Sequence, residues 1–205
     1  QGTVVPTGVQ IGGGVKAGST YRITTQGIVT PTDNKFDLAI DGRGFFQVLL
    51  PSGETAYTRA GNLSLNDQGQ LVTDDGYQIQ PAITIPQDAV DVSISKSGQV
   101  QVVKADSPTP EVAGTIELAT FINESGLEAV GDNLFMESGA SGAATTGTPG
   151  STGFGEIMQG YVEASNVDAV SEITALIVAQ RAYEMNSKVI STADEMLRAA
   201  NQVKA

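Results

Sequence analysis

The chain has no cysteine, no histidine and no tryptophan among its 205 residues. Without cysteine there are no disulfides and no thiol nucleophiles, and without histidine there is no imidazole base and no Ser–His–Asp arrangement. The same two absences remove nearly every zinc or copper site. The sequence therefore predicts no metal and no cofactor, and it leaves carboxylates as the only catalytic material.

Basic residues and long apolar runs are also scarce. Eleven Lys and Arg stand against 23 Asp and Glu, which gives a formal net charge of −12. A phosphate backbone requires a basic surface, so we expect no nucleic-acid binding. No run of eighteen apolar residues and no charged-then-apolar leader occurs, so we expect no membrane insertion and no signal peptide.

From Tyr21 to Phe121 the sequence contains short alternating segments separated by turn residues such as Asp75-Gly76 and Ser97-Gly98. Such punctuation at intervals of about eight to twelve residues is typical of an all-β domain with antiparallel neighbours. The expected strands are residues 21–29, 36–40, 45–50, 54–59, 62–65, 70–73, 77–80, 83–85, 91–95, 99–103 and 115–121. Because aromatic residues are few, Ile, Val and Leu are expected to fill the core.

Three regions follow from these patterns. Residues 1–30 are expected to be an extended connecting region, whose Gly12-Gly13-Gly14 run lacks the spacing of a dinucleotide loop. Residues 31–155 are expected to form the β domain, including a Gly/Ser/Thr-rich loop at 139–153 that cannot bury enough apolar surface to form a core. Residues 156–205 are expected to form a C-terminal assembly helix.

The stretch from Ser165 to Ala205 has no Pro or Gly, and its apolar residues recur at helical spacing. A helix near 38 residues would run roughly 57 Å. Ser165, with Asp168 three residues on, resembles a capping box. The predicted packing seam places large residues beside small ones and consists of Leu176, Ala179, Ala182, Tyr183, Asn186, Val189, Ile190, Ala193, Met196, Leu197 and Ala200.

This helix needs a partner, because an isolated helix is marginally stable in water. The rest of the chain offers no second long helix, so the partner is expected in sequence outside this chain or in another subunit. Small residues such as Ala179 and Ala193 favour close helix–helix contact over packing on a sheet. Asn186 is the polar member of the seam, and one such residue can set the register of two helices.

The carboxylate pairs each have a structural explanation. Asp74-Asp75 precede a glycine in a turn, where aspartate is favoured for local hydrogen bonds. On the helix, Glu184 precedes Lys188 and Asp194 precedes Arg198 by four residues, the spacing of exposed ion pairs. We therefore expect no enzyme. A carboxylate pair assembled from different strands stays open, so the alternative of a different class is an acidic β-domain polysaccharide hydrolase.

Several long motifs resemble one family. Residues 165–203 resemble the C-terminal helix of the bacterial flagellar rod and hook proteins. The segment DLAIDGRGFFQV at 37–48, followed by residues 57–80, resembles the β-domain signature of that family. Residues 118–142 and 155–167 are most similar to its distal rod members.

The resemblance implies a mainly β domain of short antiparallel strands plus one long C-terminal helix that pairs in a coiled-coil-like assembly. Family members carry an N-terminal partner helix, which is expected to be absent from this chain. The implied function is a structural subunit of the distal rod of the flagellar basal body, polymerising helically into a hollow rigid drive shaft that transmits motor torque to the hook. A proximal rod or hook subunit is the alternative within the family.

The resemblance also implies partners and a location. The chain is expected to bind copies of itself, other flagellar rod and hook proteins, and the P- and L-ring bushing around the rod. Its rod spans the periplasm, and the flagellar type III apparatus exports it without a cleaved signal peptide. In that picture the helix seam packs an inner tube, the β domain forms the outer wall, and residues around Gly12–Lys16 belong to an extension that stiffens the rod.

Overall fold

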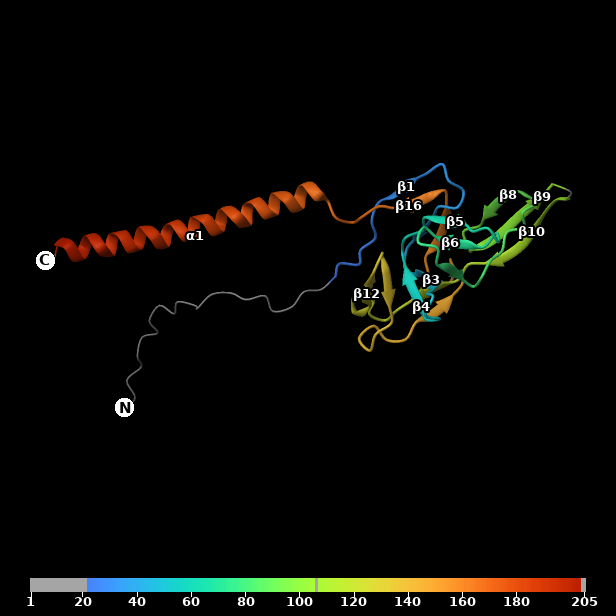
Figure 1. Cartoon of the computed structure of the whole chain (residues 1–205), viewed down its shortest axis with the longest axis horizontal. Coiled ribbons are helices and arrows are strands. Elements are labelled where there is room, and N and C mark those ends of the chain that lie inside the picture. The colour runs from blue at the N-terminus through green and yellow to red at the C-terminus, as the bar shows by residue number, and fades with distance from the viewer. Residues whose placement is uncertain (1–21, 106, 204–205) are drawn as a thin grey trace.

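A computed structural model of the protein describes residues 22–105 and 107–203. They form a β domain and one long helix that stands clear of it (Figure 1). In chain order the elements are β1 (Val29–Pro31), β2 (Leu38–Asp41), β3 (Phe45–Leu49), β4 (Thr55–Thr58), β5 (Leu63–Leu65), β6 (Leu71–Thr73), β7 (Gln78–Gln80), β8 (Ala89–Ile94), β9 (Gln99–Lys104), β10 (Ser107–Thr115), β11 (Leu118–Thr120), the 3₁₀ turn η1 (Glu124–Gly126), β12 (Glu128–Gly131), β13 (Leu134–Met136), β14 (Thr145–Gly147), β15 (Glu156–Gln159), β16 (Tyr161–Glu163) and α1 (Ala169–Val203). The predicted fold class, short antiparallel strands with one long C-terminal helix, is confirmed.

The largest sheet has nine strands, in the order β12-β13-β4-β3-β7-β6-β5, with β11 pairing both β3 and β14. Its neighbours are antiparallel because tight turns join consecutive strands, as in the β3–β4 hairpin that pairs Val48 with Ala56. A three-stranded sheet, β10-β9-β8, and the pairs β2–β15 and β1–β16 complete the domain.

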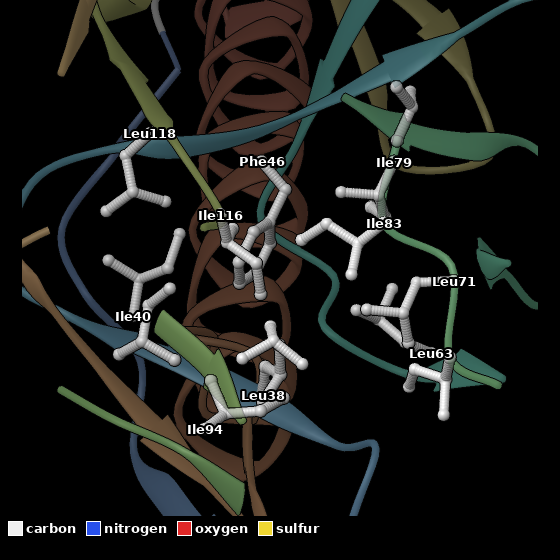
Figure 2. Packing of buried hydrophobic residues seen from close by; sticks show 14 of the residues in the cluster. Leu38, Ile40, Phe46, Leu63, Leu71, Ile79, Ile83, Ile94, Ile116 and Leu118 are labelled. Atoms are coloured by element: carbon white, nitrogen blue, oxygen red, sulfur yellow. The ribbon is translucent and has the colours of Figure 1, made fainter. Parts of the chain in front are cut away.

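Two hydrophobic clusters lie on opposite faces of β3, because successive side chains of a strand point to opposite sides. Phe46 and Val48 belong to the larger cluster, and Phe45 belongs to the smaller one. Figure 2 shows the larger cluster, in which side chains from several strands point toward one another. Both faces of the sheet are therefore covered. As expected, Ile, Val and Leu make up most of the larger cluster.

The end of the β domain differs from the prediction. Residues 156–163, which the sequence assigned to the helical region, instead form β15 and β16. Ile157 pairs with Ile40 of β2 and is 1% exposed, while Glu163 pairs with Val29 of β1. The β domain therefore extends to Glu163, and the C-terminal helix begins at Ala169.

Other strand predictions also need correction. No strand forms over Arg22–Ile28, and pairing begins only at Val29. Residues 83–85 make a single bridge, between Thr84 and Gln70, in place of a strand. The loop at 139–153 contains β14, which pairs with β11. Ser141 within it is fully buried, and its hydroxyl is satisfied there by donating to the carbonyl oxygen of Ser138.

Strands β10, β12 and β13 were not predicted from the sequence. Residues 1–21, including the proposed extension at Gly12–Lys16, lie outside the described part of the chain. Within the described ranges, no helix combines the length and apolar character needed to cross a bilayer.

Candidate assembly site

Helix α1 begins at Ala169, and Asp168 is its N-terminal cap. The Asp168 carboxylate accepts hydrogen bonds from the Ser171 hydroxyl at 2.8 Å and from the Val170 amide at 3.0 Å. These bonds, that of Ser171 first, hold the pKa of Asp168 below its ordinary value. The capping role predicted for Ser165 is wrong, because its hydroxyl accepts from Val167 before the helix starts. With 35 residues, α1 is about 52 Å long.

The predicted seam lies along α1 and is open to solvent. Its large members with described side chains are between 64% and 78% exposed: Leu176, Tyr183, Val189, Ile190 and Met196. Ala179, Ala182 and Asn186 are also exposed, and Ala193 is partly covered. Leu197 and Ala200 lie on the helical backbone, and their side chains are outside the described part of the structure. A seam of this size is apolar surface without a cover in the described part of the chain.

Small residues line a shallow groove on the first half of α1. Ala175, Ala179 and Ala182 line the groove together with Val170, Ser171, Thr174 and Val178. A helix axis can approach closely over such residues, because little side chain stands between the two backbones. The groove follows the small-residue side of the predicted seam.

The sequence prediction missed a second apolar stripe. Val170, Ile173 and Ile177 recur at intervals of three and four residues, so they share one face, and they are 73%, 58% and 45% exposed. At about 100° per residue, this face points away from Ala179 and Ala182. The spacing was visible in the sequence. The first half of α1 is therefore apolar on two sides.

The β domain holds the chain where it leads into α1. Glu163, whose side chain is 14% exposed, accepts from the Gly27 amide at 2.8 Å through Oε1 and from Arg59 Nε at 2.8 Å through Oε2. Arg59 also donates to the carbonyl oxygens of Ile40, Gly42 and Gly44 at 3.1, 2.8 and 2.9 Å. None of these contacts was predicted.

Asn166 adds a second attachment three residues nearer to α1. Its side-chain amide donates to the carbonyl oxygens of Ile23 and Thr25, at 3.3 and 2.8 Å. We call Gly27, Arg59, Glu163 and Asn166 the connector clamp, because together they join the segment entering the β domain to the segment leaving it. Side-chain-to-backbone bonds of this kind leave no periodic pattern in a sequence, which is why the prediction missed them.

The carboxylates considered for catalysis are spread over the molecule. Asp74 and Asp75 lie exposed in the turn after β6, and with Asp132 they line a pocket of about 210 Å³. Among the described residues, no group of three or more Asp or Glu is arranged to hold a metal ion. The sequence predicts ion pairs Glu184–Lys188 and Asp194–Arg198 on the helix, and neither is formed in the part of the chain that the structure describes. All ion pairs among the described residues lie in the β domain.

Comparison with known proteins gives two family matches. The model of the flagellar hook protein FlgE/F/G D1 domain matches residues 39–102, and that of the flagellar basal body rod FlgEFG protein C-terminal matches residues 158–203. The flagellar basal-body rod protein FlgG of Caulobacter vibrioides is 68% identical over 204 residues, covering 100% of this chain and 78% of that protein. The chain belongs to the FlgG family of flagellar basal-body rod proteins.

Other relatives agree with this assignment. FlgG of Bacillus subtilis is 43% identical over 194 residues, which cover 92% of this chain and 73% of that protein. The flagellar hook protein FlgE of Salmonella typhimurium is 35% identical over 183 residues, which cover 89% of this chain and 40% of the hook protein. The FlgG likeness thus extends over most of both chains. Of the connector clamp, Arg59 lies in the first matched region, and Glu163 and Asn166 lie in the second.

Proposed function

We propose that the protein is a structural subunit of the distal rod of the bacterial flagellar basal body. It polymerises helically through α1 into a hollow, rigid drive shaft that transmits motor torque to the hook. The observation that carries the proposal is the exposed apolar seam on a 35-residue helix that stands clear of its own domain, in a chain of the FlgG family.

The energetics of the seam favour assembly. Burying Leu176, Tyr183 or Ile190 contributes about 1.5–3 kcal/mol for each side chain. A helix that remains solvated gains none of this, and an isolated helix is marginal in water. Packing against helices of neighbouring subunits, with Asn186 setting the register, both covers the seam and stabilises α1.

The second stripe supports contact with more than one neighbour. Ile173 and Ile177 lie on a side of α1 turned away from Ala179 and Ala182, and the groove meets this stripe only at Val170, so one partner helix cannot cover both surfaces. A helix enclosed between several others is expected in the wall of a tube. The seam, including the backbone positions of Leu197 and Ala200, forms the tube, and the β domain lies outside it.

In this role the protein binds copies of itself and other rod and hook proteins, and the P- and L-ring surround the finished rod. It acts in the periplasmic part of the basal body, reaches it by export without a cleaved signal peptide, and catalyses no reaction. The proposal needs no bound cofactor, because burial of apolar surface drives the assembly.

The test is complementation with the full-length gene product. In cells lacking the native gene, expression of the wild-type gene should restore motility, and purified basal bodies should contain the protein in a straight rod. Curved tubes would assign the protein to the hook. A protein that is absent from basal bodies while motility is normal would contradict the proposal.

A further inference from the structure

We infer that the connector clamp is the rigid coupling through which α1 passes load to the β domain, with Glu163 as its central positioning residue. The inference concerns how force leaves the helix, and it therefore rests on the proposed function. Three segments distant in sequence meet at Glu163. They are the entering connector (residues 22–28), which contains Gly27, the residue directly after β4, Arg59, and the end of β16, from which the leaving connector (residues 164–168) runs to α1.

The Glu163 carboxylate divides its two oxygens between the other segments. Oε1 binds the backbone amide of Gly27 and Oε2 binds the guanidinium of Arg59, each at 2.8 Å. Hydrogen bonds to an ionised carboxylate are stronger than those between neutral groups. A displacement of either connector relative to the domain must therefore lengthen at least one charge-assisted bond.

Arg59 is itself immobilised from the other side. Its remaining donors bind three carbonyl oxygens, those of Ile40, Gly42 and Gly44, around the turn between β2 and β3. The guanidinium of arginine holds five N–H donors in a fixed planar fork, whereas a lysine ammonium has three donors on one atom and cannot span the same set of acceptors. Arg59 thus ties Glu163 to the backbone of the core strands.

The clamp differs from the exposed ion pairs of the molecule. The Arg59 and Glu163 side chains are 23% and 14% exposed, whereas those of Lys35 and Asp91 are 63% and 54% exposed. Water screens the exposed pair and weakens it. The shielded position of the clamp makes it suited to a fixed connection.

Close backbone packing reinforces the joint. A Cβ atom at Gly27 would overlap the carbonyl oxygen of Ala164, so the two connectors can lie this close only with glycine at position 27. The Gln26 side chain bridges the Ile40 carbonyl and the Gly42 amide at 3.1 and 3.0 Å. The entering connector is thereby fixed to the same turn that holds Arg59.

The position of the clamp gives it mechanical importance. Asn166 lies between Glu163 and Ala169, the first residue of α1, and its side chain donates a hydrogen bond to the entering connector at Thr25. Because α1 extends about 52 Å beyond this point, a small rotation at its root becomes a large displacement at its tip. Loss of the clamp leaves the short β1–β16 pairing and the Ala164 amide bond to the Ile28 carbonyl oxygen to hold the two connectors together.

The first test uses hydrogen exchange on the full-length protein. In Glu163→Gln, amides of residues 26–29 and 161–167 should exchange roughly tenfold faster, the effect of about one lost hydrogen bond. Glu111→Gln is the control, because Glu111 pairs with Lys104 in the β9–β10 hairpin and forms no hydrogen bond with the residues of the connector clamp or with the β2–β3 turn. Unchanged exchange in Glu163→Gln, or equal acceleration in both variants, overturns the inference.

The second test measures the orientation of α1. The chain has no cysteine, so Ser52→Cys and Ser191→Cys give a unique pair of spin labels, one on the β3–β4 turn and one on α1. Arg59→Lys and Gly27→Ala should each broaden the distance distribution. Gly139→Ala, where an added Cβ meets no atom within 4 Å, should not. Equal widths in all variants contradict a rigid coupling.

Motility separates this inference from the proposed function. Cells carrying Arg59→Lys should assemble rods and rotate a tethered load more slowly than cells carrying Gly139→Ala. Normal rotation under load, despite a broadened distance distribution, overturns the coupling and leaves the rod assignment intact. Absence of the wild-type protein from basal bodies overturns the rod assignment, while exchange and label distances still decide whether the clamp is rigid.

Discussion

Phe45 and Phe46 are adjacent in the chain, yet they pack in different places. Phe46 is fully buried in the larger cluster, while Phe45 lies edge to face with Phe121 and Phe135, at centroid distances of 5.9 and 6.0 Å. The alternation of a strand accounts for the separation. The strand was predictable from this alternation, but the sequence did not reveal that the second face would also be covered.

We expect Phe46→Ala to lower the free energy of unfolding by about 3–5 kcal/mol, because it removes a ring from a packed core and leaves a cavity. Urea denaturation followed by circular dichroism measures the change. Ile122→Ala is the matched control, since the Ile122 side chain is 90% exposed and its truncation should alter stability by less than about 0.5 kcal/mol. Similar losses in the two variants would contradict the assigned core.

The N-terminal cap of α1 could be predicted only in part from the local sequence. Ser165 and Asp168 both have capping side chains, and the spacing favoured the first. The structure uses Asp168, because Asn166 is engaged with Ile23 and Thr25 and the helix can begin only after that attachment. A long-range contact therefore decided a local feature.

The Asp168 cap should make α1 sensitive to acid. Because hydrogen bonding lowers the pKa of Asp168 in the folded state, its contribution is complete above the unfolded pKa of 3.8 and is lost as pH falls through the lower folded value. Far-ultraviolet circular dichroism should show less helix below that pH. Asp168→Asn keeps a capping side chain without this titration, so its helix content should fall less. Equal acid sensitivity would contradict the role of Asp168.

The strands that the sequence predicts correctly are those bounded by clear turn residues. Strands β3, β4, β8 and β9 flank glycine turns and were predicted within a residue or two. The β12–β13 hairpin has a turn signal in the sequence, the pair Asp132-Asn133, which the prediction did not use. Both residues adopt positive φ at the turn, 48° and 56°, a conformation that Asp and Asn accept more readily than most residues. In β10, Pro108 and Pro110 argue against a strand, and its edge position in the sheet is what tolerates them.

Helix α1 gives the prediction for the seam. Ile190→Asp places a charge in the proposed helix–helix contact, and it should abolish polymerisation of the full-length protein as measured by sedimentation and electron microscopy. Ser191→Asp adds the same charge one residue away, on the polar side, and should polymerise normally. The β domain should remain folded in both, because α1 stands clear of it (Figure 1). Polymerisation of Ile190→Asp would contradict the seam.

At the scale of the whole molecule, the protein consists of a domain with its own core and a helix without one. Among the described residues, every buried hydrophobic residue lies between Leu38 and Ile157, and none of the hydrophobic side chains described on α1 is buried. The helical spacing made this division predictable, but its boundary was placed too early. No sequence pattern near Glu156 indicated that β15 would pair with β2.

Because of this division, truncation after Asp168 should leave the thermal unfolding temperature of the β domain unchanged. Truncation after Gly155 should abolish its cooperative transition, because it removes Ile157 and the partner strand of β2. Differential scanning calorimetry distinguishes these outcomes. A cooperative transition in the shorter fragment would contradict the place of β15 in the core.

The β2–β15 pairing also determines when the domain can fold. Ile40 must wait for Ile157, 117 positions later, before its strand acquires a partner. At a synthesis rate of about 5–20 residues per second, the ribosome leaves β2 uncovered for about 6–23 s. During that interval Leu38, Ala39 and Ile40, all fully buried in the finished domain, form an apolar edge open to wrong pairings. The order of the strands thus delays completion of the β domain until more than three quarters of this sequence has been made.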